Sequence, residues 1–276
     1  MPEFLTEDQI DQFRRDGFLT PFDGVTPAVA RDCVDRIEAY EARVGEDVSR
    51  QIRVRAALAF EWVVAIARSP NVIGAMRDLM GPDIMIYLSA IWSKRPGGGA
   101  FVSWHQDGAY YAFDRHDGLT VWVALTDATP EMGCITVLPG SHLDPIRAHD
   151  ETFDSDNLLS RGQSITGIDK SNAVEMPLTA GQFSIHHELA VHGSGPNLSD
   201  LRRIGFSLSC VPAGTRVVEG PRSGVLVCGD PGHWETDPEP RFDFDPVSMA
   251  ALENVQTAYR DPAFRNEVER RAAERR

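Results

Sequence analysis

From residue 84 onward the chain is a succession of short segments rich in β-branched and aromatic residues, and this feature constrains the fold most. Gly, Pro, Asn and Asp separate the segments, which is typical of strands joined by turns and loops. Six or seven strands with long, uneven connections predict an antiparallel sandwich or jelly roll, and therefore a mainly β protein. The expected strands cover residues 84–92, 101–107, 119–126, 134–138, 182–186, 203–211 and 225–227.

The part of the chain before these strands is expected to be helical. Thr6 and Gln9 form a capping-box pattern at the start of a first helix, and Gly17 is a suitable stop. Apolar residues at helical spacing predict a second helix over residues 27–44. A third helical stretch, in one or two pieces, covers residues 56–80. These helices are expected to flank the β core.

The sequence shows no internal repeat, and we expect one domain over residues 1–276. A helical layer over residues 1–82 precedes a jelly-roll core over residues 83–228. An irregular acidic segment and a C-terminal helix complete residues 229–276. Within the core, residues 143–180 are polar and weakly patterned, so a long loop or lid is expected there.

Charge and composition exclude several classes of partner. The chain has 27 Lys and Arg against 41 Asp and Glu, a formal charge of −14. Nucleic acids and anionic membrane surfaces need a basic face, so neither is expected as a partner. No apolar run approaches the ~20 residues of a membrane helix, and the N-terminus lacks the pattern of a signal peptide.

The cysteines are too few and too widely spaced for a disulfide scaffold or a CxxC pair. We therefore expect free thiols and a reducing, cytoplasmic location. The four residues are Cys33, Cys134, Cys210 and Cys228.

The residues with the clearest chemical meaning are His105 and Asp107. On a strand, positions i and i+2 point to the same face, so this imidazole and this carboxylate should project together. An H-x-D pair alone is weak evidence for a metal site. A later histidine would strengthen it, and the candidates are His186, His187 and His192.

Two histidines and one carboxylate form a facial triad that binds Fe(II) and leaves other coordination positions open for oxygen and a second ligand. Arg203 follows His192 by eleven residues. A guanidinium pairs bidentately with a carboxylate, so an arginine near such a site indicates a co-substrate that carries a carboxylate.

Three stretches together resemble the phytanoyl-CoA dioxygenase family of Fe(II)- and 2-oxoglutarate-dependent oxygenases. They are WHQD at residues 104–107, TVWVALTDATPEMGCITVLPGSH at residues 120–142 and HGSGPNLSDLRR at residues 192–203. Order and spacing match over residues 84–211, and EDQIDQFRRDGFL near the N-terminus is similar to the family's opening helix. The resemblance implies a double-stranded β-helix (jelly-roll, cupin-like) core with Fe(II), 2-oxoglutarate and O2 as cofactor and co-substrates.

The resemblance also implies roles for single residues. His105, Asp107 and His192 would hold iron, with His186 and His187 less favoured as ligands. The remaining implied roles are 2-oxoglutarate contacts: Arg203 at the distal carboxylate, Ser194 hydrogen-bonded to it, and Trp122 and Lys94 nearby.

Arg202 is the alternative carboxylate clamp. Because neighbouring residues of a strand point to opposite faces, only one of Arg202 and Arg203 can point inward. The eleven-residue offset from His192 favours Arg203.

The expected activity is hydroxylation of a small organic metabolite. In related halogenases a small residue replaces the carboxylate and frees a position for chloride, whereas this chain keeps Asp107. Aromatic residues near the triad are candidate substrate contacts: Trp92, Tyr110, Tyr111 and Phe113. Two alternatives are a non-catalytic jelly-roll binding or regulatory protein and a cupin-like metal hydrolase or isomerase that does not use 2-oxoglutarate.

Overall fold

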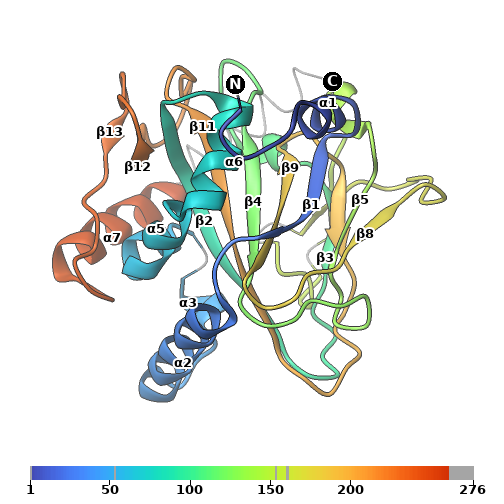
Figure 1. The fold of residues 1–276 in the computed structure, drawn as a ribbon. Coiled ribbons are helices and arrows are strands. Elements are labelled where there is room, and N and C mark those ends of the chain that lie inside the picture. The colour runs from blue at the N-terminus through green and yellow to red at the C-terminus, as the bar shows by residue number, and fades with distance from the viewer. Residues whose placement is uncertain (1, 53, 153, 160–161, 261–276) are drawn as a thin grey trace.

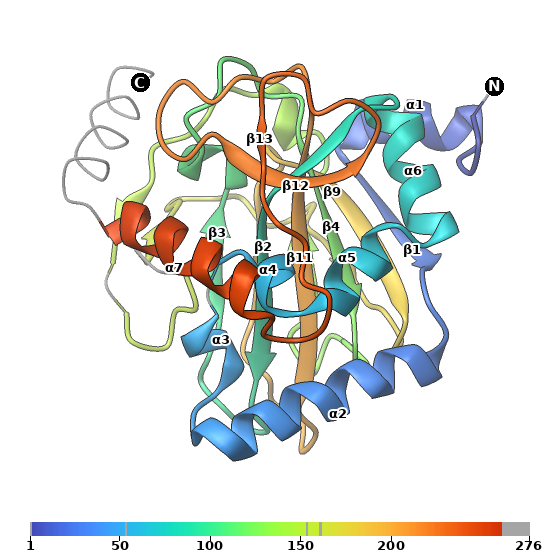
Figure 2. The same ribbon diagram turned by 90° about the vertical axis from the view of Figure 1, so that its left-hand side faces the viewer.

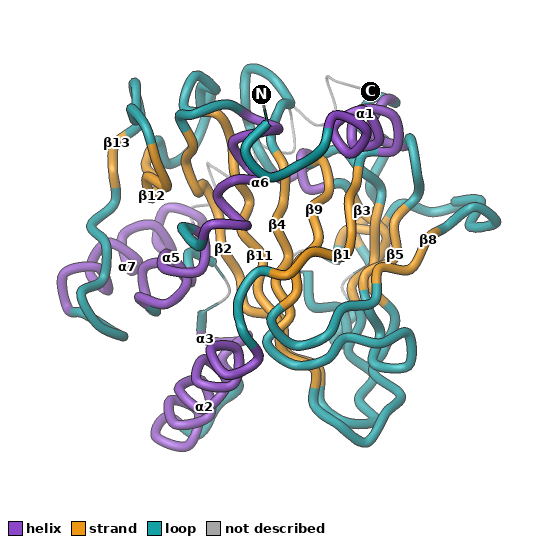
Figure 3. Tube along the Cα trace, viewed as in Figure 1, coloured by secondary structure: helices purple, strands orange, loops and turns teal. Residues whose placement is uncertain are grey.

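A computed structural model describes residues 2–52, 54–152, 154–159 and 162–260. Two β-sheets, which are mostly antiparallel, face each other, and helices cover the outer face of the larger sheet (Figures 1 and 3). This is the expected mainly β fold with flanking helices, a double-stranded β-helix core. None of the helices within the described ranges has the length and apolar character needed to cross a membrane.

The larger sheet has seven strands in the order β1-β9-β4-β11-β2-β12-β13. All neighbours are antiparallel except β12 and β13. The strands are β1 (Phe18–Asp23), β2 (Ile84–Lys94), β4 (Leu119–Ala124), β9 (Gln182–His187), β11 (Arg203–Pro212), β12 (Ser223–Cys228) and β13 (Glu235–Thr236).

The smaller sheet has the order β3-β10-β5-β8. Its strands are β3 (Val102–His105), β5 (Ile135–Val137), β8 (Val174–Met176) and β10 (His192–Ser194). A separate two-stranded sheet and two 3-10 helices lie in the connections: β6 (Asp150–Glu151), β7 (Gln163–Ser164), η1 (Asp107–Tyr110) and η2 (Ser141–Leu143).

The helices are α1 (Glu7–Asp16), α2 (Pro27–Val44), α3 (Val48–Gln51), α4 (Ala56–Ala59), α5 (Glu61–Ala67), α6 (Pro70–Met80) and α7 (Pro246–Arg260). The predicted capping box is confirmed: Thr6 Oγ1 accepts from the Gln9 N–H at 3.2 Å, and Gln9 Oε1 accepts from the Thr6 N–H at 2.8 Å. Gly17 ends α1 with a φ of 79°, a left-handed conformation that favours glycine. The predicted bounds of α2 are also confirmed.

Figure 2 shows α2, α4, α5 and α7 in front of the larger sheet. The alternation of β11 explains this packing. Ile204, Phe206 and Leu208 face the helices and belong to the largest apolar core. Phe206 meets Trp62 of α5 edge to face, with ring centroids 5.3 Å apart. The alternate residues of the same strand face the space between the two sheets, where the candidate site lies.

Several elements differ from the sequence prediction. The third helical stretch is three helices, α4, α5 and α6, and the long loop over residues 143–180 contains β6, β7 and β8. Strands β1 and β10 were not predicted, because β1 contains a proline and β10 is a three-residue strand with a central glycine. The tail prediction holds for α7, and residues 261–276 lie outside the described residues.

Candidate active site

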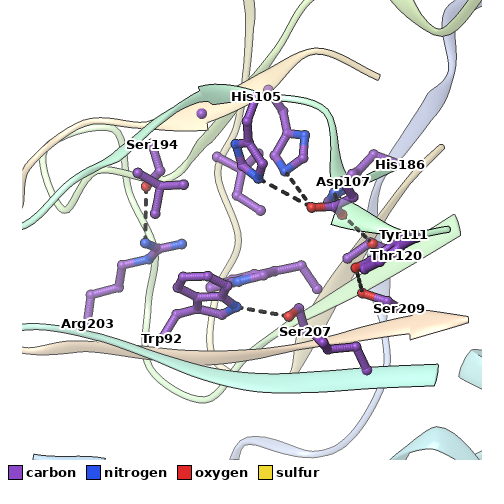
Figure 4. A pocket seen from close by; sticks show the side chains of 16 residues that line it. Trp92, His105, Asp107, Tyr111, Thr120, His186, Ser194, Arg203, Ser207 and Ser209 are labelled. Carbon is purple, nitrogen blue, oxygen red and sulfur yellow. Dashed lines mark hydrogen bonds and ion pairs between the residues drawn. The ribbon is translucent and has the colours of Figure 1, made fainter. Parts of the chain in front are cut away.

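A cavity lies between the two sheets, and the three predicted metal ligands line it (Figure 4). His105 ends β3 and His192 begins β10, and the two residues are register partners on adjacent strands. Asp107 does not lie on β3, because the strand ends at His105 and Asp107 starts the 3-10 helix η1. The strand expected over residues 101–107 was therefore too long, yet the turn still brings the carboxylate beside the imidazole.

One potential ligand atom from each of His105, Asp107 and His192 lies within 4.8 Å of the other two. Oδ1 of Asp107 is 3.3 Å from His105 Nε2 and 3.9 Å from His192 Nε2. These residues fit the metal that the facial-triad pattern requires, since all three donor atoms converge on one point.

The other ring nitrogens fix the orientation of both imidazoles. His105 Nδ1 lies 2.8 Å from the Ser103 carbonyl oxygen, and His192 Nδ1 lies 2.9 Å from the Ala190 carbonyl oxygen. A carbonyl only accepts, so each Nδ1 carries a proton, and in a neutral ring Nε2 then keeps the lone pair that a metal needs. Such backbone partners orient ligating histidines in metal sites generally.

The pKa shifts of the triad residues also favour the binding of a metal cation. Burial alone would raise the pKa of Asp107, but the nearby imidazoles of His192, His105 and His186 hold it well below its usual value. Burial, with His105 and His186 nearby, lowers the pKa of His192 well below its usual value. Asp107 therefore favours the carboxylate and His192 the neutral imidazole, the protonation states that metal binding needs.

Arg203 lies at the other end of the cavity on β11, with only 1% of its surface exposed. It donates to Ser194 Oγ at 3.3 Å and lies over the Trp122 ring at 4.4 Å from the centroid. Burial lowers its pKa to about 10. Among the described residues no carboxylate pairs with Arg203, and its Nε has no partner. A buried cation without an anion is costly, so this end fits a carboxylate supplied by a ligand.

Lys94 is the register partner of Arg203 across β2 and β11. It is buried and donates to Ser194 Oγ and to the carbonyl oxygens of Gly133 and Gly195. Burial and the neighbouring Arg203 lower the pKa of Lys94 to about 6. Lys94 therefore holds the Ser194 side chain in place by a hydrogen bond, and it does not itself line the cavity.

Trp122 occupies its place because its indole lies against Gly205 of β11, which has no side chain. A Cβ atom on Gly205 would be 2.3 Å from Trp122 Cζ2. The indole can therefore lie against β11 and under the guanidinium of Arg203 only if residue 205 has no side chain. This geometry places Trp122 in the cavity wall, as the sequence predicted.

The structure distinguishes between the alternative residues that the sequence left open for the carboxylate clamp and the metal ligands. Arg202 points to the outer face and forms a bidentate ion pair with Glu41, with both N–O distances 2.7 Å. His187 packs against Phe13 and His142, away from the cavity. His186 does line the cavity, and it lies beside the triad.

A second cavity adjoins the first and shares Trp92, Tyr111 and the His105–Asp107 pair with it. Of the candidate substrate residues, Trp92, Tyr110 and Tyr111 line this outer cavity. Phe113 does not line either cavity. It is buried in a separate apolar cluster, where it meets Tyr87 edge to face at 4.8 Å, so its assignment as a substrate contact is corrected.

Sequence reasoning missed several residues of the two cavities. Thr120, Ser207 and Ser209 line the inner cavity from β4 and β11. The period-two alternation of these strands could have indicated them, because small polar residues repeat on one face. Leu158 and Leu159 line the outer cavity from the long loop, where no periodic signal exists.

Comparison with known proteins agrees with this geometry. The sequence model of the family described as Phytanoyl-CoA dioxygenase (PhyH) matches residues 13–205, and the chain belongs to this family. A solved structure of the non-heme monooxygenase ThoJ in its apo form superposes with a TM-score of 0.80 at 28% identity, covering 97% of this chain and 99% of that chain.

Two curated relatives extend the comparison. A probable alpha-ketoglutarate-dependent hypophosphite dioxygenase from Stutzerimonas stutzeri is 32% identical over 59% of this chain and 58% of its own length. The peroxisomal phytanoyl-CoA dioxygenase of Bos taurus is 31% identical over 51% of this chain and 43% of its own length. The chain therefore spans about half the length of these curated relatives.

Proposed function

We propose that the protein is an Fe(II)- and 2-oxoglutarate-dependent oxygenase that hydroxylates a small organic molecule. The observation that carries the proposal is the pairing, within one cavity, of the His105–Asp107–His192 group with the buried and unpaired Arg203. The triad accounts for a metal, and the arginine accounts for a dicarboxylic co-substrate. A metal hydrolase or isomerase would have no use for the second feature.

The protein's own groups bind and orient the reactants. The triad would hold the cation, and Arg203, which contacts Ser194 and Trp122, would bind the distal carboxylate of 2-oxoglutarate. When bound, iron and 2-oxoglutarate supply the activation of O2. In the overall reaction one oxygen atom enters succinate, CO2 leaves, and the other oxygen atom enters a C–H bond of the substrate. Asp107 would supply a carboxylate ligand where a chlorinating enzyme needs room for chloride, which favours hydroxylation over chlorination.

The outer cavity supports an organic substrate. Trp92, Leu158 and Leu159 contribute apolar surface next to the triad. Among the described residues, Arg203 is the cation that lines either cavity, and the proposed co-substrate uses it. Within the described residues that line the two cavities, an anion such as hypophosphite would find no second cation. We therefore propose a substrate that presents an uncharged, largely apolar face to the metal.

The test is succinate release from 2-oxoglutarate by the protein with Fe(II), ascorbate and air. A panel of organic candidates, with hypophosphite alongside, is then screened by mass spectrometry for a gain of one oxygen atom. We expect metal-dependent succinate release that an organic compound increases. A non-catalytic binding protein, a hydrolase or an isomerase would release none.

We also propose a cytoplasmic location. All four cysteines are free, and three of them are buried. Free thiols are the usual state in a reducing compartment, which supports this proposal. Fractionation of the native host, followed by detection of the protein with an antibody, tests it.

A further inference from the structure

A third imidazole, that of His186, lies beside the proposed metal ligands and has no role in the proposed function. His186 of β9 is 1% exposed and lines the inner cavity. Within the described part of the chain, neither of its ring nitrogens has a hydrogen-bond partner. A buried polar group without a partner destabilises the fold, so its presence at this position needs an explanation.

The two oxygens of Asp107 face different groups. Oδ1 faces the two other ligands, His105 and His192, through their Nε2 atoms. Oδ2 accepts from the Thr120 hydroxyl at 2.7 Å and lies 3.6 Å from His186 Nε2. The carboxylate therefore has a metal side at Oδ1 and a supporting side at Oδ2.

Strand pairing explains why Thr120 and His186 reach the same oxygen. They are register partners on β4 and β9, so their side chains leave the sheet together toward the cavity. Figure 4 shows both side chains on the side of Asp107 away from Arg203. A closure of a few tenths of an ångström would bring His186 Nε2 into hydrogen-bond range of Oδ2.

We propose that His186 is a positioning residue of the metal site, whose Nε2–H donates to Oδ2 of Asp107. With Thr120 it supplies two donors to that oxygen and leaves Oδ1 as the single ligand atom. The inference rests on the proposed metal site. A nitrogen that carries this proton has no lone pair for the metal, so His186 is not a fourth ligand.

The neighbouring histidine provides the contrast. His187 has the same chemistry but points to the other face of β9, where its Nδ1 accepts from the Leu189 N–H at 3.1 Å. A role for His186 in metal binding should therefore be absent at His187. Groups that orient a ligating carboxylate typically change metal affinity by about 10–100-fold when removed.

The test measures Co(II) binding to metal-free protein by competition with a chelator, together with the visible spectrum of the bound ion. We expect His186→Leu and His186→Phe to weaken Co(II) binding by about 10–100-fold and to alter the spectrum. His186→Gln keeps an N–H donor and should bind within about threefold of wild type. His187→Gln should match wild type in both affinity and spectrum.

Three results would overturn the inference. Wild-type affinity and spectrum in both apolar variants would show that His186 has no part in metal binding. Loss of binding as complete as in His192→Ala, with no recovery in His186→Gln, would make His186 a ligand. If neither apolar variant folds in the absence of metal, the residue is structural. Wild-type protein that releases no succinate would refute the oxygenase and leave these Co(II) results standing.

Discussion

The two faces of the larger sheet differ in the kind of residue that each buries. On β11, Ile204, Phe206 and Leu208 pack against the helices and belong to the largest apolar core. On the opposite face, Arg203 and Ser207 point into the cavity between the sheets. The outer face buries apolar side chains, as expected for a stable core. The inner face buries polar and charged side chains, although apolar ones would stabilise the fold more.

This difference distinguishes residues that stabilise the fold from residues that bind ligands. Each large apolar side chain on the outer face stabilises the fold by about 1.5–3 kcal/mol on burial. On the inner face, Arg203 Nε and both nitrogens of His186 are buried without a partner in the described chain. Substitutions on the outer face should therefore change unfolding, and those on the inner face should change ligand binding.

The largest effect is expected at the metal ligands. His192→Ala removes an imidazole whose Nε2 faces Asp107 Oδ1 at 3.9 Å. Since the loss of a supporting group already costs about 10–100-fold in affinity or activity, the loss of a ligand should exceed about 100-fold. Succinate formation from 2-oxoglutarate measures this loss. His105→Ala should behave in the same way, and wild-type activity in either variant would refute the ligand assignment.

Phe206→Ala tests the outer face. It removes a fully buried ring that packs against Trp62, so the free energy of unfolding should fall by about 3–5 kcal/mol. Urea unfolding measures the change. Affinity of the folded protein for 2-oxoglutarate, determined by calorimetry with Fe(II) under nitrogen, should stay close to wild type. A large loss of affinity without a loss of stability would break the separation of the two faces.

Arg203→Met tests the inner face of the same strand. Loss of a buried charge pair with the co-substrate should weaken 2-oxoglutarate binding by about 2–5 kcal/mol, roughly 30-fold to several thousand-fold. The unfolding free energy should be unchanged or higher, because an unpaired buried cation is removed.

Arg202→Met is the matched control for Arg203→Met. It breaks the ion pair with Glu41 on the outer face and should reduce stability while leaving the affinity for 2-oxoglutarate intact. If Arg202→Met weakened binding and Arg203→Met did not, the assignment of the two arginines would be reversed.

A smaller effect is expected from Lys94, whose pKa is lowered to about 6 by burial and by Arg203. Between that value and its ordinary pKa of 10.5, the unfolded chain binds more protons at this group, so stability without ligand should rise with pH. A bound dicarboxylate favours the charged amine and raises its pKa.

Binding of 2-oxoglutarate near pH 8 should therefore take up as much as one proton. Affinity should fall by at most about tenfold per pH unit as the pH rises. Calorimetry in buffers of different ionisation enthalpy measures the uptake. Lys94→Met should abolish it, and equal uptake in both proteins would assign the proton to another group.

Local rules were sufficient for much of the fold. The capping box at Thr6 and Gln9 and the spacing of apolar residues in α2 act over one helix, and both are confirmed. The main strands were found because β-branched and aromatic residues gather between turn residues. Histidine, aspartate and arginine at motif spacing predicted residues that the fold then places in one cavity.

The remaining features of the site depend on tertiary contacts, which local sequence patterns do not predict. Asp107 reaches the site from a 3-10 helix, because β3 ends earlier than the alternation indicated. Phe113 has the residue type of a substrate contact, but the chain turns it into a cluster with Tyr87 and Trp234. The proposed role of His186 follows only from the pairing of β9 with β4, which places His186 beside Thr120.

The most direct test of the central claim supplies isotopically labelled O2 to the Fe(II)-loaded protein with 2-oxoglutarate and follows the label by mass spectrometry. The account predicts succinate that carries one labelled oxygen atom, with none formed by His192→Ala or in the absence of metal. It also predicts one labelled oxygen atom in the hydroxylated product once a substrate is found. Absence of succinate, or a product that takes its oxygen only from water, would contradict the assignment as an oxygenase.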